Sequence, residues 1–225
     1  MPWIRSGLRS LFPSLTWQAR PQVARVVAAC SDDATIVDLG AGGRQVTATT
    51  ITVDHAPLPG TRLIADIESL PIAPGSVDLI IATGLLEHVA DLDAVSAEMV
   101  RILKPGGRVH VEIPFLQQYH DDPIDCRRFT QPGLVRHLES LGLTVEQDGV
   151  HIGPSVTLIT LTAYYFSLWF QGSSLLSKVV SNGVFLLVSI LLFPLKYLDA
   201  FLIKRPGAHR LAFGVYATAR KAVDP

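Results

Sequence analysis

Four residues stand just after short apolar runs in the first third of the chain: Gly40, Gly42, Asp54 and Asp66. Glycines at such positions let the main chain turn tightly and let a ligand approach it closely. A carboxylate such as Asp54 can accept both hydroxyls of a ribose. Asp66 can accept from an adenine amino group while the Ile67 main-chain amide serves the ring. The pattern suits a nucleoside, and Asp38 is expected at the mouth of the same site.

A second group of residues could do acid–base chemistry. Glu87 and His88 occur in LLEHV, and His120 occurs in QQYHDD. A histidine titrates near neutrality and can act as general base towards a hydroxyl, with a nearby carboxylate to orient it. Alternatives stay open: Glu87 and His88 could cap a helix or line the cofactor pocket, and the segment around His120 could be a solvated loop. Arg127 and Arg128 could close that loop or hold an anionic acceptor.

These side chains need a scaffold of alternating strands and helices. Strand-like runs occur at Thr35–Leu39, Thr50–Asp54, Arg62–Asp66, Ser76–Ala82, Arg108–Pro114 and Ala212–Arg220. Leu92–Leu103 and Gln131–Leu141 have helical spacing, and Lys104–Gly107 predicts the turn that follows the first of these helices. Alternation of this kind predicts a parallel α/β sheet, in which ligands bind beyond the carboxyl ends of the strands.

Four segments together resemble the class I S-adenosylmethionine (SAM)-dependent methyltransferases, particularly methyltransferase type 11: VDLGAGG, TVDHA, ADIESLP and SVDLII…LEHV…LKPGG. The resemblance covers roughly residues 35–145. It implies a Rossmann-like open sheet, mostly parallel with an antiparallel last strand. It also implies that the glycine loop cradles the methionine part of SAM, that the acid ending the second strand binds ribose, and that the acid after the third binds adenine. The corresponding residues are Asp38, Gly40, Gly42, Asp54 and Asp66.

Two departures from the family pattern lie in the glycine loop. Arg44 replaces the third glycine of the usual G-x-G-x-G, and Gln45–Thr49 is very short for the helix that normally follows. The amino-acid end of SAM is therefore expected to be held differently. NAD fits less well, because its loop needs a small residue where Gln45 stands and a helix N-terminus beside the pyrophosphate.

Residues 152–203 interrupt the α/β pattern with a hydrophobic helical insertion before the last strand, in which Lys178 is the one charge between His151 and Lys196. Helical spacing predicts a neutral polar stripe at Thr157, Thr160, Tyr164, Ser167 and Gln171. Spanning a bilayer takes about 20 apolar residues, so each predicted helix is marginal for that. A charge at the bilayer centre costs roughly 2.5–3.5 kcal/mol, so Lys196 and Asp199 make a deep span costly.

We therefore expect shallow insertion at a membrane surface, with basic residues against anionic headgroups at Lys204, Arg205 and Arg210. A buried helical pair and a protein–protein interface are the alternatives. The predicted divisions are an amphipathic segment 1–20, a methyltransferase domain formed by 21–151 and 211–225, and the insertion 152–210.

The composition limits the classes of molecule that the protein is expected to bind. A net charge of −1 with 17% charged residues argues against nucleic acid. Cys30 and Cys126 have no metal-binding spacing, so no metal is predicted, and a reducing compartment is the default. The predicted enzyme transfers a methyl group from SAM to a hydroxyl of a lipid-linked or other membrane-associated acceptor, at the cytoplasmic face of a membrane. A non-catalytic scaffold with the same fold is the alternative, and the oligomeric state stays open.

Overall fold

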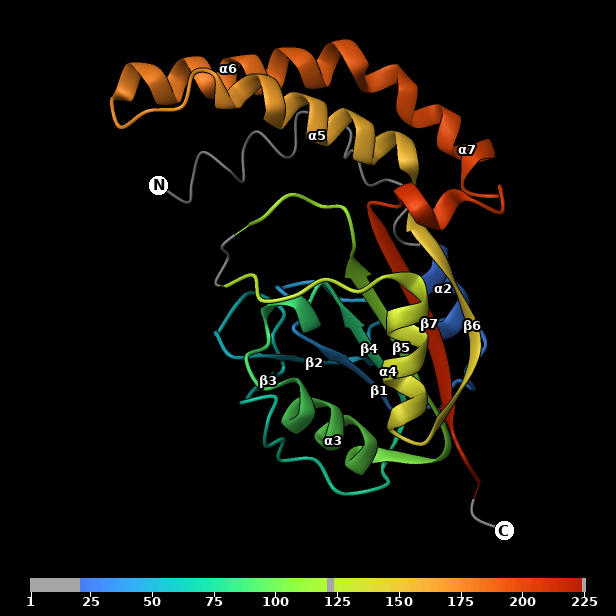
Figure 1. Cartoon of the computed structure of the whole chain (residues 1–225). Coiled ribbons are helices and arrows are strands. Elements are labelled where there is room, and N and C mark those ends of the chain that lie inside the picture. The colour runs from blue at the N-terminus through green and yellow to red at the C-terminus, as the bar shows by residue number, and fades with distance from the viewer. Residues whose placement is uncertain (1–20, 121–123, 224–225) are drawn as a thin grey trace.

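The computed structural model describes residues 21–120 and 124–223, so the predicted segment 1–20 and the acids Asp121 and Asp122 lie outside the described residues. In the described part of the chain, a seven-stranded sheet has the order β3-β2-β1-β4-β5-β7-β6 (Figure 1). Its strands are β1 (Ile36–Leu39), β2 (Ile51–Asp54), β3 (Leu63–Ile64), β4 (Val77–Thr83), β5 (Leu103–Pro114), β6 (Leu143–Ile152) and β7 (Gly214–Lys221). Within this sheet β7 pairs antiparallel with both β5 and β6, and the other neighbouring strands pair parallel. The predicted open sheet with an antiparallel last strand is confirmed.

Helices cover both faces of the sheet because successive side chains of a strand point to opposite sides. In β4, Leu79 and Ile81 pack against α2 (Pro21–Ala28), while Ile80 points to the main core on the other face. That core also receives apolar side chains from α3 (Leu92–Ile102) and α4 (Gln131–Ser140).

One predicted turn is part of the sheet. Lys104–Gly107 was expected to form a turn outside the strands, but β5 begins at Leu103, directly after α3. Leu103 pairs with Val77 and Arg108 pairs with Leu79, so the residues between them form a bulge in β5. Gly106 has a φ of 77°, a conformation that suits glycine. The prediction of a separate turn was wrong. Turn-forming residues such as glycine occur both in loops and in β-bulges, so the sequence did not distinguish the two.

The connection from β1 to β2 contains no helix among its residues, all of which the structure describes. Sequence spacing left little room for a helix at Gln45–Thr49, and the chain crosses there as an irregular loop instead. Between β1 and β2, loop main chain and loop side chains therefore take the place of a helix beside the sheet.

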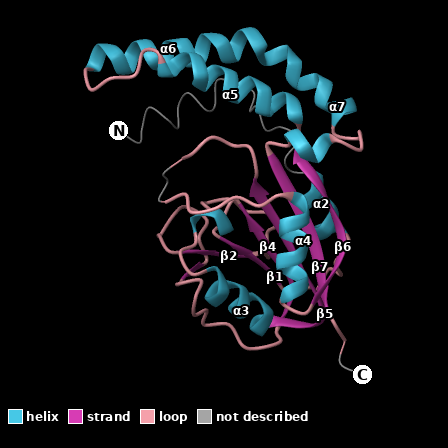
Figure 2. Ribbon diagram, in the orientation of Figure 1, coloured by secondary structure: helices cyan, strands magenta, loops and turns pink. Residues whose placement is uncertain are grey.

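The insertion is a helical hairpin of α5 (Pro154–Leu168) and α6 (Leu175–Leu192), followed by the short helices η2 (Phe193–Leu198), α7 (Asp199–Leu202) and η3 (Ala208–Leu211). Figures 1 and 2 show α5 and α6 side by side, beyond the end of the sheet. The Phe213 amide donates to the Ile152 carbonyl oxygen at 3.1 Å, so the insertion leaves and rejoins the sheet at one point.

The hairpin buries its small polar residues and exposes its large apolar ones. Thr157, Thr160 and Ser167, which belong to the predicted polar stripe, are buried, and the Ser181 hydroxyl of α6 donates to the Ser167 carbonyl oxygen at 3.0 Å. Large apolar side chains point outward, including Trp169 (73% exposed), Leu175 (79%), Leu176 (73%) and Leu191 (68%). A helix whose outer face meets water has the opposite arrangement, with its apolar side chains buried and its polar side chains exposed.

By length and composition alone, the helical stretch Leu175–Leu202 could cross a membrane: it has 28 residues, and its apolar window has a mean hydropathy of 2.0 and is 6% buried. The two charges expected to oppose insertion do not point outward. Lys196 is 2% exposed and lies over the Phe193 ring, and Asp199 is 1% exposed. Tertiary packing buries both charges, so the predicted cost of placing them in a bilayer does not fall on the outer surface of the hairpin.

Asp199 caps a helix that is distant from it in sequence. Its Oδ1 accepts from the Ser155 amide at 2.8 Å and its Oδ2 accepts from the Val156 amide at 3.3 Å, in the first turn of α5. Gly153 makes room for this carboxylate, since a Cβ there would lie 2.4 Å from Asp199 Cγ. A negative charge at this end also complements the helix dipole.

We predict that Asp199→Ala lowers the free energy of unfolding by about 1–3 kcal/mol, because two buried amides lose their acceptor. Denaturant unfolding in detergent, followed by far-UV circular dichroism, measures it. Asp199→Asn keeps one carbonyl acceptor and should lose less. Equal stability of Asp199→Ala and the wild type would show that the cap contributes nothing.

Candidate functional site

The loop after β1 has an open side at the carboxyl end of the sheet. Gly40, Gly42 and Gly43 have φ values of 62°, 58° and 80°. A Cβ on Gly40 would lie 2.6 Å from Leu85 Cδ1, so this glycine lets the loop pack against the segment that follows β4. A Cβ on Gly42 would meet no atom of the described residues within 4 Å. A ligand can therefore approach the main chain at Gly42.

Asp54 is buried at the end of β2, where the structure brings it to the glycine loop. Its Oδ2 accepts from the Gly42 amide at 2.9 Å, and its Oδ1 accepts from the Ala56 amide at 3.2 Å. Oδ1 also lies 3.1 Å from His55 Nδ1. A carboxylate has about four acceptor positions, so these three contacts still leave capacity for a ligand. Asp54 thus holds the glycine loop in shape.

Asp66 and Ile67 follow β3, the edge strand next to β2. Asp66 is exposed, and its Oδ1 accepts from the Glu68 amide at 2.9 Å. Ile67 is partly buried against the main core. The Ala65 amide donates to the Asp54 carbonyl oxygen at 3.1 Å, which ties this segment to the end of β2. The predicted ribose and adenine positions therefore stand on neighbouring strand ends.

The sequence predicts that Asp38 lies at the open mouth of the site, and the structure contradicts this. Its side chain is fully buried in β1, and the Arg44 guanidinium covers it, with Nη2 2.6 Å from Oδ1 and Nε 3.1 Å from Oδ2. Arg44 also donates to the Thr83 hydroxyl at the end of β4. Burial raises the pKa of Asp38, and Arg44 opposes that rise. The arginine that replaces the family's third glycine thus occupies the space in front of Asp38.

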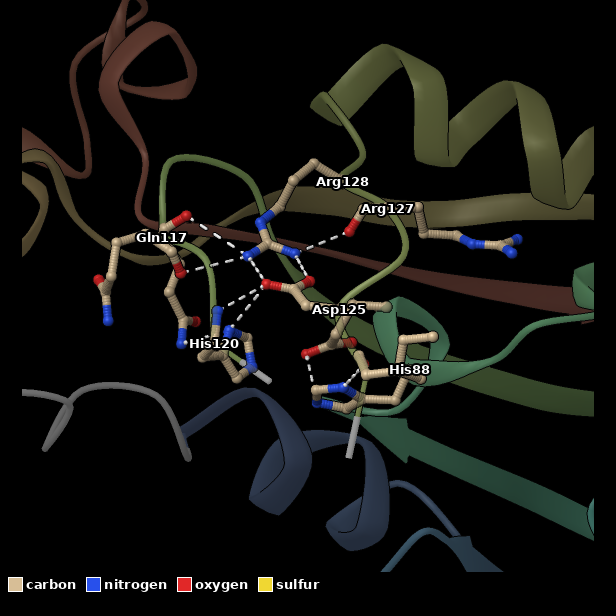
Figure 3. A network of polar contacts seen from close by, with 9 residues as sticks. His88, Gln117, His120, Asp125, Arg127 and Arg128 are labelled. Carbon is tan, nitrogen blue, oxygen red and sulfur yellow. Dashed lines mark hydrogen bonds and ion pairs between the residues drawn. The ribbon is translucent and has the colours of Figure 1, made fainter. Parts of the chain in front are cut away.

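A second polar cluster gathers Glu87, His88 and His120, which the sequence had singled out in two separate segments. One ligand atom of each lies within 4.8 Å of the other two. Glu87 and His88 belong to η1 (Leu86–His88), and His120 lies in the loop after β5. The His88 and His120 rings meet edge to face with centroids 5.0 Å apart (Figure 3).

Asp125 and Arg128 fix the loop that carries His120 (Figure 3). Asp125 Oδ2 accepts from the His120 amide at 2.9 Å and lies 3.2 Å from His120 Nδ1, and the Gln117 amide lies 3.4 Å from the same nitrogen. Hydrogen bonds from Arg128 lower the pKa of Asp125 to about 2. Arg127 donates to the carbonyl oxygens of Val89 and Ala90. Of the two alternatives for the arginine pair, this geometry favours closing the loop.

Burial raises the pKa of Glu87, which is 2% exposed. Its carboxylate lines a cavity of about 140 Å³ between the ends of β4, β5, β6 and β7. The cavity is also lined by Gly84, Glu112, Gln117, His151 and Gly214, among others. Gly214 pairs with Pro114 of β5 and with Ile152 of β6, so α5 begins beside this cavity.

Sequence reasoning missed the polar residues on the inner side of β5. His110 Nδ1 lies 2.8 Å from the Thr218 hydroxyl, His110 Nε2 lies 3.3 Å from Glu112 Oε1, and His151 Nε2 lies 4.0 Å from Glu112 Oε2. Burial lowers the pKa of His151 and so favours its neutral form. The alternation in RVHVEIP could have revealed these residues, because a strand places every second side chain on the same face. Arg108, His110 and Glu112 share that face.

Part of the chain matches a known protein family. Residues 22–111 match the family model described as "Methyltransferase domain". An "Uncharacterized methyltransferase" of Mycobacterium ulcerans (strain Agy99) is 40% identical over 53 residues, which are 24% of this chain and 21% of that protein. An "Uncharacterized 37.1 kDa protein in transposon TN4556" of Streptomyces fradiae is 42% identical over 53 residues, 23% of this chain and 15% of that protein. The matches thus span about a fifth or less of these relatives' length.

Solved structures share the fold at low sequence identity. A 1,6-didemethyltoxoflavin-N1-methyltransferase of Burkholderia thailandensis, solved with S-adenosylhomocysteine, has a TM-score of 0.56 and 17% identity, covering 92% of this chain and 79% of that chain. The [4+2]-cyclase SpnF has a TM-score of 0.57 and 16% identity, covering 90% of this chain and 81% of that chain. One fold therefore includes proteins named for different reactions.

Proposed function

We propose that the chain transfers a methyl group from SAM to a hydroxyl of a lipid-linked or otherwise membrane-associated molecule. Its basis is the match of residues 22–111 to a methyltransferase domain, together with the methyltransferase-like sheet. One observation carries this proposal. The glycine loop with Asp54, the Glu87–His88–His120 cluster and the start of the apolar hairpin all lie at the carboxyl edge of the sheet. Cofactor, acceptor and membrane contact would then meet at one edge.

The residues present fit the nucleoside end of SAM. Gly42 offers open main chain, and Asp54 would accept from the ribose hydroxyls. Exposed Asp66 and the Ile67 amide would serve the adenine. At the amino-acid end, Asp38 is already paired with Arg44, so the guanidinium is the group that would hold the carboxylate of SAM. SAM supplies a methyl group activated by its sulfonium.

The chain's own contribution would be alignment and proton removal. Holding two reactants in near-attack geometry can lower a barrier by about 7–11 kcal/mol. Glu87 and His120 stand at the cavity end of the site, where a base would take the proton of the acceptor hydroxyl. The neighbouring Asp125 orients His120 in this role.

We predict that His120→Ala slows methyl transfer by about 100-fold to 10,000-fold, as for loss of a general base. SAM affinity should stay at the wild-type value, because the polar contacts of His120 are with Gln117 and Asp125 and not with the glycine loop. The assay follows label from methyl-labelled SAM into a lipid extract of the host, with calorimetry for SAM. His209→Ala, outside the cluster, is the control. An unchanged rate would remove His120 from the mechanism.

The second candidate is a binding or scaffold module without turnover. Arg44 over Asp38 and the missing helix between β1 and β2 favour it, since both alter the place where the family holds the amino-acid end of SAM. Titration calorimetry of the folded full chain in detergent separates the two candidates. Micromolar binding of SAM supports the enzyme, and no detectable binding supports the scaffold.

A membrane surface is proposed as the partner of the hairpin. Without water outside, helices associate through small and polar residues and expose their apolar ones, which is the arrangement of α5 and α6. Lys204, Arg205 and Arg210 follow the apolar stretch and would face anionic headgroups. Shallow insertion from the cytoplasmic side fits a hairpin whose two ends are joined by a hydrogen bond.

A further inference from the structure

We propose that Glu87, His88 and His120 bind a divalent transition-metal ion. Two imidazoles and one carboxylate form a ligand set used by zinc and by iron(II). Ligands bound at about 2.1 Å in a tetrahedral or facial arrangement lie about 3.0–3.4 Å from one another. The ligand atoms here lie within 4.8 Å of one another, so side-chain rotations that draw them together by about 1–2 Å would close the site.

Both histidines are already oriented as metal ligands usually are. His88 Nδ1 lies 2.5 Å from the Ile124 carbonyl oxygen, which can only accept, so Nδ1 carries the proton. This leaves Nε2 as the free donor of a lone pair, 3.8 Å from Glu87 Oε1. At His120, the Asp125 carboxylate lies 3.2 Å from Nδ1 and favours the same tautomer over the longer contact of 3.4 Å from the Gln117 amide nitrogen, which would need Nδ1 without a proton. Metal-binding histidines commonly bond a carbonyl or carboxylate through their second nitrogen in this way.

Glu87 provides an independent observation. The residue is 2% exposed, and its Oε2 has no hydrogen-bond partner among the residues that the structure describes. A buried carboxylate oxygen without a partner is costly. A cation between Glu87 and the two rings would satisfy it. The adjoining cavity of about 140 Å³ leaves room for a further ligand from the acceptor.

The role of the ion, unlike its binding, rests on the proposed function. Bound to the acceptor hydroxyl, it would lower the pKa of that group as it does for water. The acceptor oxygen then forms a bond to the methyl carbon as the carbon–sulfur bond breaks. The sulfur keeps the electron pair. With the ion bound, His120 acts as a metal ligand in place of the general-base role given above, and the hydroxyl proton passes to water.

The test is a titration of the full chain in detergent, without a histidine tag and after treatment with a chelator, with Co²⁺. We expect one equivalent to bind and produce a visible ligand-field absorption band, and Zn²⁺ to displace it. Glu87→Gln and His88→Ala should each weaken binding by at least about 10-fold to 100-fold, the effect of losing even an outer-shell group. His209→Ala should bind as the wild type does.

Circular dichroism and SAM calorimetry on the same samples report folding and keep the two proposals apart. SAM binding with no Co²⁺ binding overturns the metal site and leaves the methyltransferase proposal standing. Co²⁺ binding without SAM binding does the opposite. If folded Glu87→Gln and His88→Ala retain wild-type Co²⁺ affinity and spectrum, the cluster is not the site.

Discussion

Asp54→Ala is expected to weaken SAM binding by about tenfold to a hundredfold. Two ribose hydroxyls would lose a charged acceptor, which is worth about 1.5–3 kcal/mol. The side chain also accepts from the Gly42 and Ala56 amides, so its loss should loosen the glycine loop. For this reason the free energy of unfolding should also fall, by about 1–3 kcal/mol. Calorimetry well below the unfolding temperature measures the affinity.

Two comparisons separate ribose contact from loop support. Asp33→Ala, an exposed acid before β1, is the matched control and should bind SAM normally. A 2′-deoxy analogue of S-adenosylhomocysteine should lose less affinity than S-adenosylhomocysteine itself when Asp54 is truncated, because one hydroxyl is already absent. Equal losses for the two ligands would mean that Asp54 acts through the loop alone. Wild-type affinity in Asp54→Ala would refute the assignment altogether.

Removing the hairpin is expected to release the protein from membranes. Residues 154–207 can be replaced by a short Gly/Ser linker, because Gly153 and Ala208 flank the junction where Phe213 and Ile152 are hydrogen bonded. Ala208 is kept because it is buried in the main core. The full chain should float with anionic vesicles, and the shortened chain should remain in solution. Binding scales with apolar area, at about 25 cal/mol per Å² removed from water.

Point variants test the same surface without a deletion. Leu176→Asp places a charge on the exposed apolar side of α6 and should weaken vesicle binding severalfold or more. Asn182→Asp, in the same helix at a position that is already polar and exposed, is the matched control. If the intact protein stays wholly soluble and monomeric without detergent, the membrane proposal fails.

The sequence alone determined the class of fold and the order of its parts. Apolar runs such as Val77–Thr83 mark buried parallel strands, and glycines mark turns, because these patterns depend on neighbours within a few residues. The same locality identified the insertion, whose apolar content is visible without knowing its partners. The polar stripe of Thr157, Thr160 and Ser167 was also visible, but the side it faces was not.

Only the tertiary structure decided which distant residues meet. Arg44 could be seen to break a glycine pattern, but its position over Asp38 follows from a loop that crosses without a helix. Asp199 could be recognised as a charge, but its place at the first turn of α5 depends on how the hairpin folds back. The strand order brings the ends of β4 and β5 together, and with them Glu87 and His120. Contacts between elements depend on this packing, which local periodicity does not encode.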